Sequence, residues 1–151
     1  MTRWLSEDEQ RSWRAWLNAT LLLNAQLNHD LQQTHDLTLA DYEILVHLSE
    51  SPDRRVRMSD LADRVNSSRS RLSHQIDRME RASLVERQQC DVDKRGAFAV
   101  LTDHGWDVLV SAAPDHVESV RRNLLDALTE EEFAALGASC QRIADRLQEL
   151  R

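Results

Sequence analysis

The chain has 151 residues, of which 41% are hydrophobic and 30% charged, with three glycines and two prolines. This length suits one domain with a sizeable core, and the composition is typical of an ordered, mostly helical protein. No apolar run approaches the roughly 20 residues that cross a bilayer. The charged N-terminal segment also lacks the apolar core of a signal peptide, so we expect a cytoplasmic protein with no membrane partner.

The net charge of −7 argues at first against a nucleic-acid partner, because phosphate binding depends on lysine and arginine. The distribution of charge reverses this argument. Residues 54–96 hold 11 basic and 7 acidic side chains, a net charge of +4, which leaves −11 for the rest of the chain. Ten of those cations are arginines, whose forked guanidinium suits guanine edges, phosphates and narrow grooves. The pattern indicates a basic head on an acidic body, although charge alone would also fit a solvated face.

A capping box opens the first predicted helix, because Ser6 is followed by Glu9 at the spacing that satisfies two free backbone N–H groups. Apolar residues recur at helical spacing from there to about residue 34. This predicts one long helix whose apolar stripe is broad enough for two packing partners. Trp13 and Trp16 lie in this stripe, where they would either pack in a core or interface or line a ligand pocket.

Thr38 and Asp41 repeat the capping-box spacing and open a second predicted helix over residues 39–50. Turn-forming residues around Pro52 end this helix. Residues 54–57 are then typical of a short extended segment, which we expect to form a third strand beside a later hairpin.

Residues 58–80 are typical of a helix-turn-helix, with the turn at Asn66 and Ser67. In its second helix the apolar residues form one stripe, and cationic and hydrogen-bonding side chains occupy the other sides. The stripe consists of Leu72, Ile76 and Met79, and the other sides carry Arg69, Ser70, Arg71, Ser73 and His74. Such a helix has one side to bury and one side to present to a partner.

Two strand-like runs follow, over residues 84–90 and 97–101. The polar connection between them, residues 91–96, ends in a glycine and carries several charges. The simplest interpretation is a β-hairpin with a charged tip.

The remainder of the chain is predicted to be helical. Thr102 can cap a helix over residues 103–127, with a bend expected at Pro114. A third capping box, at Thr129 and Glu132, opens a last helix with an apolar stripe along one face.

The first and last predicted helices together carry more apolar surface than a slim monomer could cover, which predicts a helical dimer interface. Two heads related by a two-fold axis would then read a palindromic DNA site. Their recognition helices would lie about one DNA turn apart, or a multiple of it.

At this point the residues resemble a known family. The segments that carry the resemblance are Leu61-Ala62, the helix 68–80, Leu84-Val85-Glu86-Arg87, Asp93-Lys94-Arg95-Gly96, and Leu101-Thr102 with Gly105. They resemble the MarR family of winged-helix transcriptional regulators, over essentially the whole chain. The strand, wing and Leu-Thr series is the most specific part, because a helix-turn-helix alone would be weak evidence.

The resemblance implies a fold that is mainly α with a small β-hairpin wing. A winged helix-turn-helix head over residues 36–105 would sit on a helical dimerisation body, residues 1–35 and 106–151, with about six helices in a single MarR-type domain. It also implies a homodimer that binds palindromic promoter DNA, usually as a repressor.

The resemblance also implies roles for single residues. Ser68, Arg69, Ser70, Arg71, Ser73 and His74 fall where such proteins contact major-groove bases and phosphates. Arg69 and Arg71 are the expected guanine contacts. Arg95 falls where the wing arginine enters the minor groove, and Asp93 where a carboxylate orients it, although an exposed turn pair is the alternative. Arg78 and Lys94 are expected phosphate contacts. The positions of Arg71 and His74 hold different residues across the family, so the resemblance does not predict the operator sequence.

The family typically senses small aromatic or phenolic compounds, and some members sense oxidants through cysteine. Trp16, Tyr42 and His47 would face such a ligand pocket, or else pack in the core. Cys90 lies at the root of the wing, where oxidation would add a polar group, so a redox switch is the alternative to ligand release. Cys140 is expected to be an inert thiol.

The sequence contains few features that would support another class of function. The six histidines have no zinc-type spacing, so we expect neither a metal nor a cofactor. An architectural winged helix without sequence preference is a second hypothesis, against which the arginines and the wing argue. An enzyme is the third, and no Gly-rich phosphate loop, Gly-x-Ser-x-Gly motif or paired-carboxylate cleft supports it.

Overall fold

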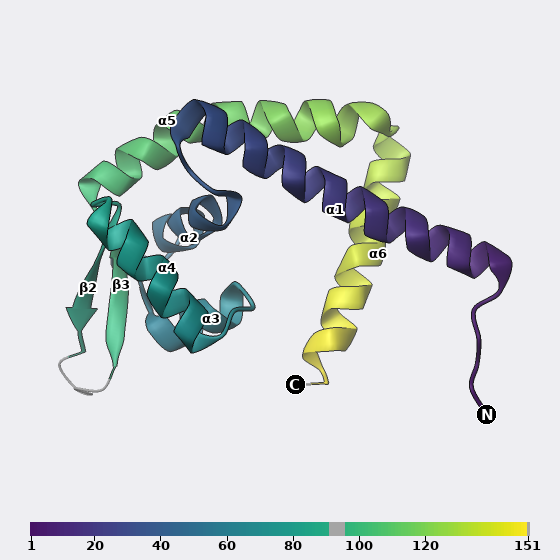
Figure 1. Cartoon of the computed structure of the whole chain (residues 1–151), viewed down its shortest axis with the longest axis horizontal. Helices are drawn as coiled ribbons and strands as arrows, with labels where there is room; N and C mark the ends of the chain where they lie inside the picture. Colours follow the sequence, from purple (N-terminus) through teal and green to yellow (C-terminus); the bar gives the residue numbers. More distant parts are fainter. Residues whose placement is uncertain (91–95, 151) are drawn as a thin grey trace. The chain divides into compact units, whose positions relative to one another are not determined.

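The computed structural model of the chain describes residues 1–90 and 96–150. Over these residues it has six α-helices, two short 3-10 helices and one three-stranded antiparallel sheet (Figure 1). This confirms the expected fold, which is mainly α with a small β wing. The chain divides into two compact units, Met1–Leu27 with Val117–Arg151 and Asn28–His116. None of the described helices is both long and apolar enough to cross a membrane.

The helices of the first unit begin where the capping boxes place them. α1 (Glu7–His35) begins after Ser6, whose hydroxyl accepts a hydrogen bond from the Glu9 N–H at 3.2 Å while the Glu9 carboxylate accepts one from the Ser6 N–H at 2.8 Å. α6 (Glu130–Gln148) begins after the same reciprocal pair, made by Thr129 and Glu132 at 2.9 and 3.1 Å. Each box satisfies two backbone donors that the first helical turn leaves free.

The helix after the wing ends earlier than expected. α5 (Asp103–Asn123) passes through Pro114 and ends at Asn123, and a 3-10 turn, Leu125–Ala127, replaces the last predicted turn. The Asn123 side chain donates to the Ser119 carbonyl oxygen at 2.9 Å, and Leu124 leaves the helical region of φ and ψ. The expectation of a helix to about residue 127 was therefore wrong by one turn.

The first unit leaves most of its apolar side chains exposed. Within α6, whose residues are all described, no side chain is buried. Ile143 and Leu147 are 53% and 57% exposed, and Leu21 and Leu22 of α1 are 70% and 59% exposed. The apolar stripes of α1 and α6 therefore lack the partners that would cover them within one chain.

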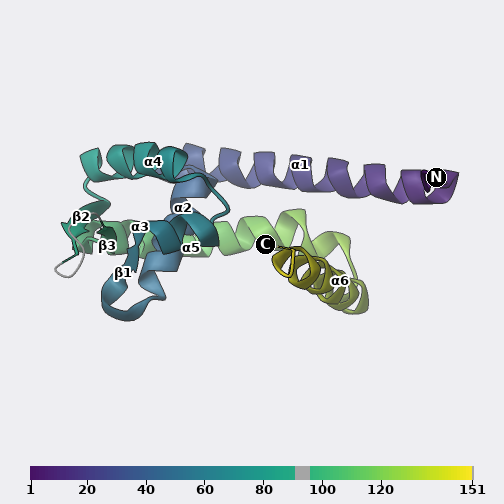
Figure 2. The same cartoon turned by 90° about the horizontal axis from the view of Figure 1, so that it is seen from below.

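The second unit holds the hydrophobic core and the wing. Its elements after α1 are α2 (Leu39–Ser49), a 3-10 turn (Pro52–Arg54), β1 (Arg55–Arg57), α3 (Met58–Arg64), α4 (Arg69–Arg81), β2 (Val85–Gln89) and β3 (Ala97–Leu101). The strand order is β1-β3-β2, and both pairs are antiparallel, so the expected third strand is confirmed (Figure 2). Leu45, Leu61, Leu72 and Ile76 are fully buried in the core beneath the sheet.

Two local devices set the geometry of this unit. Asn66 takes a positive φ of 51°, which turns the chain between α3 and α4, and the Ser67 N–H closes the turn on the Ala62 carbonyl oxygen at 2.9 Å. Gly105 lies in the first turn of α5 against the residue that precedes β2, where a Cβ atom would overlap the Leu84 carbonyl oxygen. Only glycine allows this close approach of the two backbones.

Candidate nucleic-acid interface

Helix α4 has the two-sided character that the sequence predicts. Leu72, Ile76 and Met79 are buried on its inner side, at 0%, 0% and 2% exposure. The outer side exposes Arg69, Ser70, Arg71 and His74. Burial of the apolar stripe fixes the rotation of the helix about its own axis, so this polar row faces away from the core.

Two of the three predicted serine contacts, Ser68 and Ser73, already have structural roles. The Ser68 hydroxyl caps α4 by accepting a hydrogen bond from the Arg71 N–H at 3.2 Å. Its own proton remains available to a partner. Ser73 is half-buried, and both its hydroxyl and its carbonyl oxygen accept hydrogen bonds from Arg87.

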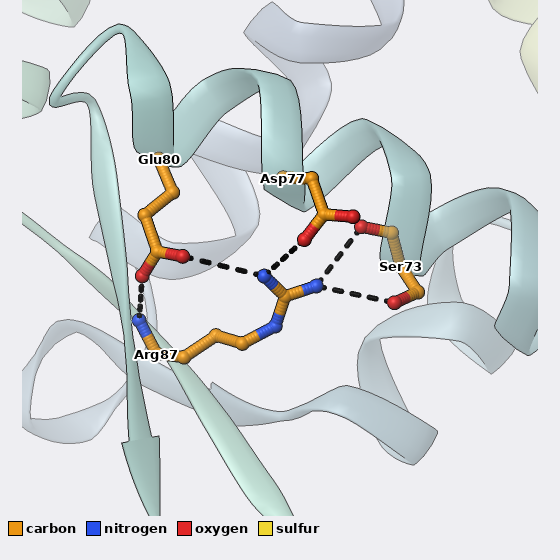
Figure 3. Close-up of polar contacts among 4 residues, drawn as sticks. All are labelled: Ser73, Asp77, Glu80 and Arg87. Carbon is orange, nitrogen blue, oxygen red and sulfur yellow. Dashed lines mark hydrogen bonds and ion pairs between the residues drawn. The ribbon is translucent and has the colours of Figure 1, made fainter.

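Arg87 of β2 is the centre of a polar network (Figure 3). Its Nη1 lies 2.6 Å from Asp77 Oδ1 and 3.3 Å from Glu80 Oε1. Its Nη2 donates to the carbonyl oxygen and the hydroxyl of Ser73 at 2.9 and 3.1 Å, and its backbone N–H donates to Glu80 Oε2 at 2.8 Å. One side chain therefore ties the first wing strand to one side of the recognition helix.

The sequence alone predicts no separate role for Arg87. The signal that would have found it is the pair Asp77 and Glu80, two carboxylates three residues apart on the same side of a helix that the sequence predicts to face DNA. Carboxylates there would repel phosphates unless a nearby cation neutralised them. Arg87 supplies that cation.

Arg78 stands close to a carboxylate on α2. Its Nη2 lies 3.8 Å from Asp41 Oδ1, and Gln75 Nε2 donates to the same oxygen at 2.8 Å. The Arg78 side chain is nevertheless 55% exposed. An ion pair of this length with an exposed cation is weak, so the guanidinium can turn to a phosphate at little cost.

A groove of about 530 Å³ adjoins the first turns of α4. Its lining comes from the start of α3, the first turns of α4 and the wing strands: Arg57, Met58, Ser59, Arg69, Leu72, Ser73, Arg87, Gly96 and Ala97. Three arginines and two serines line it without any acidic side chain among the described residues. Such a lining suits an anionic partner.

Comparison with known proteins identifies the family. A model of the MarR family matches residues 35–96. AbsC of Streptomyces coelicolor, a MarR family transcriptional regulator, is 51% identical over 98% of this chain and 99% of its own, with a TM-score of 0.91. Sco3205 of the same organism, solved in complex with DNA, is 43% identical over 98% of this chain and 92% of its own, with a TM-score of 0.94. The transcriptional regulator HosA of Escherichia coli is 32% identical over 72% of this chain and 76% of its own.

The chain belongs to the MarR family. It is therefore a DNA-binding transcriptional regulator with a winged-helix fold. The polar row of α4 and every groove residue except Ala97 lie in the part of this MarR protein that the family model matches.

The wing tip of this MarR protein lies outside the described residues, and with it the predicted contacts Asp93, Lys94 and Arg95. At its root, the Cys90 N–H donates to the Gly96 carbonyl oxygen at 3.1 Å and closes the hairpin. The Cys90 side chain is 3% exposed. Burial separates its thiol from dissolved oxidants.

The predicted ligand-pocket residues fall in different surroundings. Tyr42 is buried, and its ring lies 4.4 Å from the ring of His116. Burial raises the pKa of Tyr42 and lowers the pKa of His116. The buried Nδ1 atom of His116 has no hydrogen-bond partner among the residues that the structure describes.

The other two predicted pocket residues do not join this pair. His47 is half-buried on α2, and Trp16 belongs to the first unit, where it is 39% exposed. Cys140 of α6 is half-buried. Over residues 1–90 and 96–150, no three His, Cys, Asp or Glu side chains gather as a metal site would need.

Proposed function

We propose that this protein is a homodimeric repressor that binds a palindromic promoter site and releases it when a small aromatic or phenolic ligand binds. The observation that carries this proposal is the polar row of α4, which stays exposed while the opposite side of the helix is fully buried. A rigid helix with cationic and hydrogen-bonding groups on its outer side fits the DNA major groove.

Within this row, Arg69 and Arg71 are the proposed guanine contacts, and each bidentate contact would be worth about 1–3 kcal/mol of discrimination. Ser70 and His74 would add less selective bonds. Arg78 would bind a phosphate. In the wing, Arg95 would enter the minor groove, and Asp93 would orient it. Lys94 would bind a phosphate.

The proposed dimer is supported by the uncovered stripes of α1 and α6 in the first unit. Exposed leucines, isoleucine and tryptophans at this density are typical of an interface between subunits. A two-fold dimer presents two recognition helices to the two halves of a palindrome.

The proposed ligand response rests on the second unit. Tyr42 and His116 form an aromatic pair, and the His116 Nδ1 atom has no partner among the described residues, which suits a phenolic compound. The half-buried His47 is a further candidate in this unit, and Trp16 is a separate candidate in the first unit. A redox response through Cys90 is less well supported, because its side chain is buried.

The experiment that tests the proposal is selection of binding sites from randomised DNA duplexes by the full-length protein. We expect a palindromic consensus, and Arg71→Ala should relax the preference at one position of each half-site. Arg81→Ala is the matched control, because Arg81 is exposed at the far end of α4. A loss that is uniform over all sequences would make Arg71 a phosphate contact, and the absence of any consensus would reject sequence-specific repression.

A further inference from the structure

One face of the three-stranded sheet carries a pair of arginines that belong to β1 and not to the recognition helix α4. In β1 the middle residue, Val56, is buried, and both flanking residues, Arg55 and Arg57, are exposed. Alternation along a strand places these two side chains on the same side of the sheet. Phe98 of β3, the residue directly opposite Arg57, is half-buried.

Both guanidinium groups gather at the ring of Phe98. The Arg55 Cζ lies 4.6 Å from the ring centroid, and the Arg57 Cζ lies 5.5 Å from it. Arg55 pairs with Val100 and not with Phe98, so its side chain extends along the sheet to reach the Phe98 ring, which lies opposite Arg57. We call Arg55, Arg57 and Phe98 the β1 cluster.

An aromatic ring positions a cation without neutralising it. Among the described residues, neither Arg55 nor Arg57 forms an ion pair, whereas Arg87 faces two carboxylates. The two cations of the β1 cluster are thus held in place with their charge available to a partner.

Carboxylates near the β1 cluster are fewer than the cations. A hollow of about 300 Å³ beside it is lined by Arg55, Arg57, Phe98, Arg64, Asp53 and Asp60, together with Ser51, Pro52 and Val56. Three arginines face two aspartates there, so the local charge remains positive. Negatively charged partners are therefore favoured at this surface.

The β1 cluster is continuous with the proposed DNA interface. Arg57 also lines the groove of about 530 Å³ that contains Arg69 and Ser73 of α4 and Gly96 at the end of the wing connection. A row of cations therefore runs from the start of the recognition helix, through Arg57, to Arg55. The partner that presents a matching row of single negative charges is a nucleic-acid backbone.

We propose that the β1 cluster binds backbone phosphates of the operator next to the segment read by α4. It contributes affinity that does not depend on base sequence, and Phe98 orients both guanidinium groups. This inference rests on the proposed function, because it assumes that α4 enters the major groove.

Salt dependence of binding tests this directly. The slope of log K against log salt is negative, and each phosphate contact that is lost reduces its magnitude by about 0.9. Arg55→Gln and Arg57→Gln should each reduce the magnitude by about 0.9, and the double variant should reduce it by about 1.8. Affinity should fall by the same factor for the operator and for random DNA. Arg57→Lys should keep the wild-type slope, because it keeps the charge. Phe98→Leu should weaken binding by a smaller factor than the double variant, because both cations remain but lose their position.

Arg142→Gln on α6 is the control, since it removes the same charge from the other unit and reports the effect of net charge alone. Thermal melting of each variant checks that the fold is intact. A double variant with the wild-type slope on both DNAs would overturn the proposal, and so would an Arg57→Gln variant that relaxes preference at a single base. If instead the wild-type protein shows no preference for any operator, the proposed function fails, while a lowered slope would still support phosphate binding by the β1 cluster.

Discussion

The guanidinium of Arg87 lies 2.6 Å from the carboxylate of Asp77, and this contact joins the wing to the recognition helix. Arg87 lies in the middle of β2, and Asp77 lies about two and a half turns after the N-cap Ser68 of α4. The same guanidinium holds Ser73 and Glu80, so it spans about two turns of the helix. In the proposed function, α4 and the wing enter adjacent grooves together, and a link of this kind would set the angle between them.

Replacement of Arg87 by alanine should lower both stability and operator binding. Asp77 and Ser73 lose their bonds to the guanidinium, and Glu80 keeps only the bond from the backbone N–H of residue 87, so we expect the free energy of unfolding to fall by about 1–3 kcal/mol. Uncompensated carboxylates would also repel the DNA backbone, so operator affinity should fall further than stability explains. Denaturant unfolding and operator titration measure the two effects, with Glu86→Ala on the same strand as control. Wild-type values for Arg87→Ala in both assays would refute this role.

Gly105→Ala should destabilise the second unit. Its Cβ atom would overlap the Leu84 carbonyl oxygen, which is backbone and cannot swing away. Overpacking of this kind costs about 1–3 kcal/mol. Gly137→Ala in α6 is the matched control, because nothing lies within 4 Å of its Cβ position, and it should stabilise the helix by up to about 1 kcal/mol. Equal melting temperatures for the two variants would contradict the close approach at Gly105.

Local signals in the sequence predicted the beginnings of the helices. The boxes at Ser6 with Glu9 and at Thr129 with Glu132 satisfy donors within a single turn, so they do not depend on the rest of the fold. The buried stripe of α4 was equally predictable, because helical spacing alone defines it.

Contacts between distant segments could not be predicted in this way. Arg87 meets residues 7, 10 and 14 positions earlier, and only the packing of β2 beside α4 brings them together. Arg55 and Phe98 meet through strand pairing whose register the sequence leaves open.

Acidification should destabilise the protein through His116. Burial lowers its pKa in the folded state below the ordinary 6.5, so the unfolded chain binds the proton more readily. The contribution of neutral His116 to stability is complete above 6.5 and is lost as the pH falls below 6.5 towards the folded pKa. Unfolding measured from about pH 7.5 to about pH 5 should therefore show a smaller loss for His116→Gln than for the wild type. His29→Gln, at an exposed position on α1, is the control, and identical pH profiles for all three proteins would reject the prediction.

Leu147→Asp should disrupt the proposed dimer. Leu147 is 57% exposed on α6, and a carboxylate at that position would have to be buried in an apolar interface. Sedimentation should then show monomers or unfolded chain. Gln148→Asp introduces the same group at the next residue, on a different side of the helix, and should leave the dimer intact. A stable Leu147→Asp dimer would place the interface elsewhere.

Sequence-specific DNA binding is tested most directly by titration of the purified protein with the DNA that flanks its own gene. The titration is run at two salt concentrations with random DNA as competitor. We expect tight binding, centred on a palindrome, that survives the competitor at both salt concentrations. Weak binding that falls equally for both DNAs as salt rises would mean that the basic head supplies only charge, and it would contradict the proposed repressor.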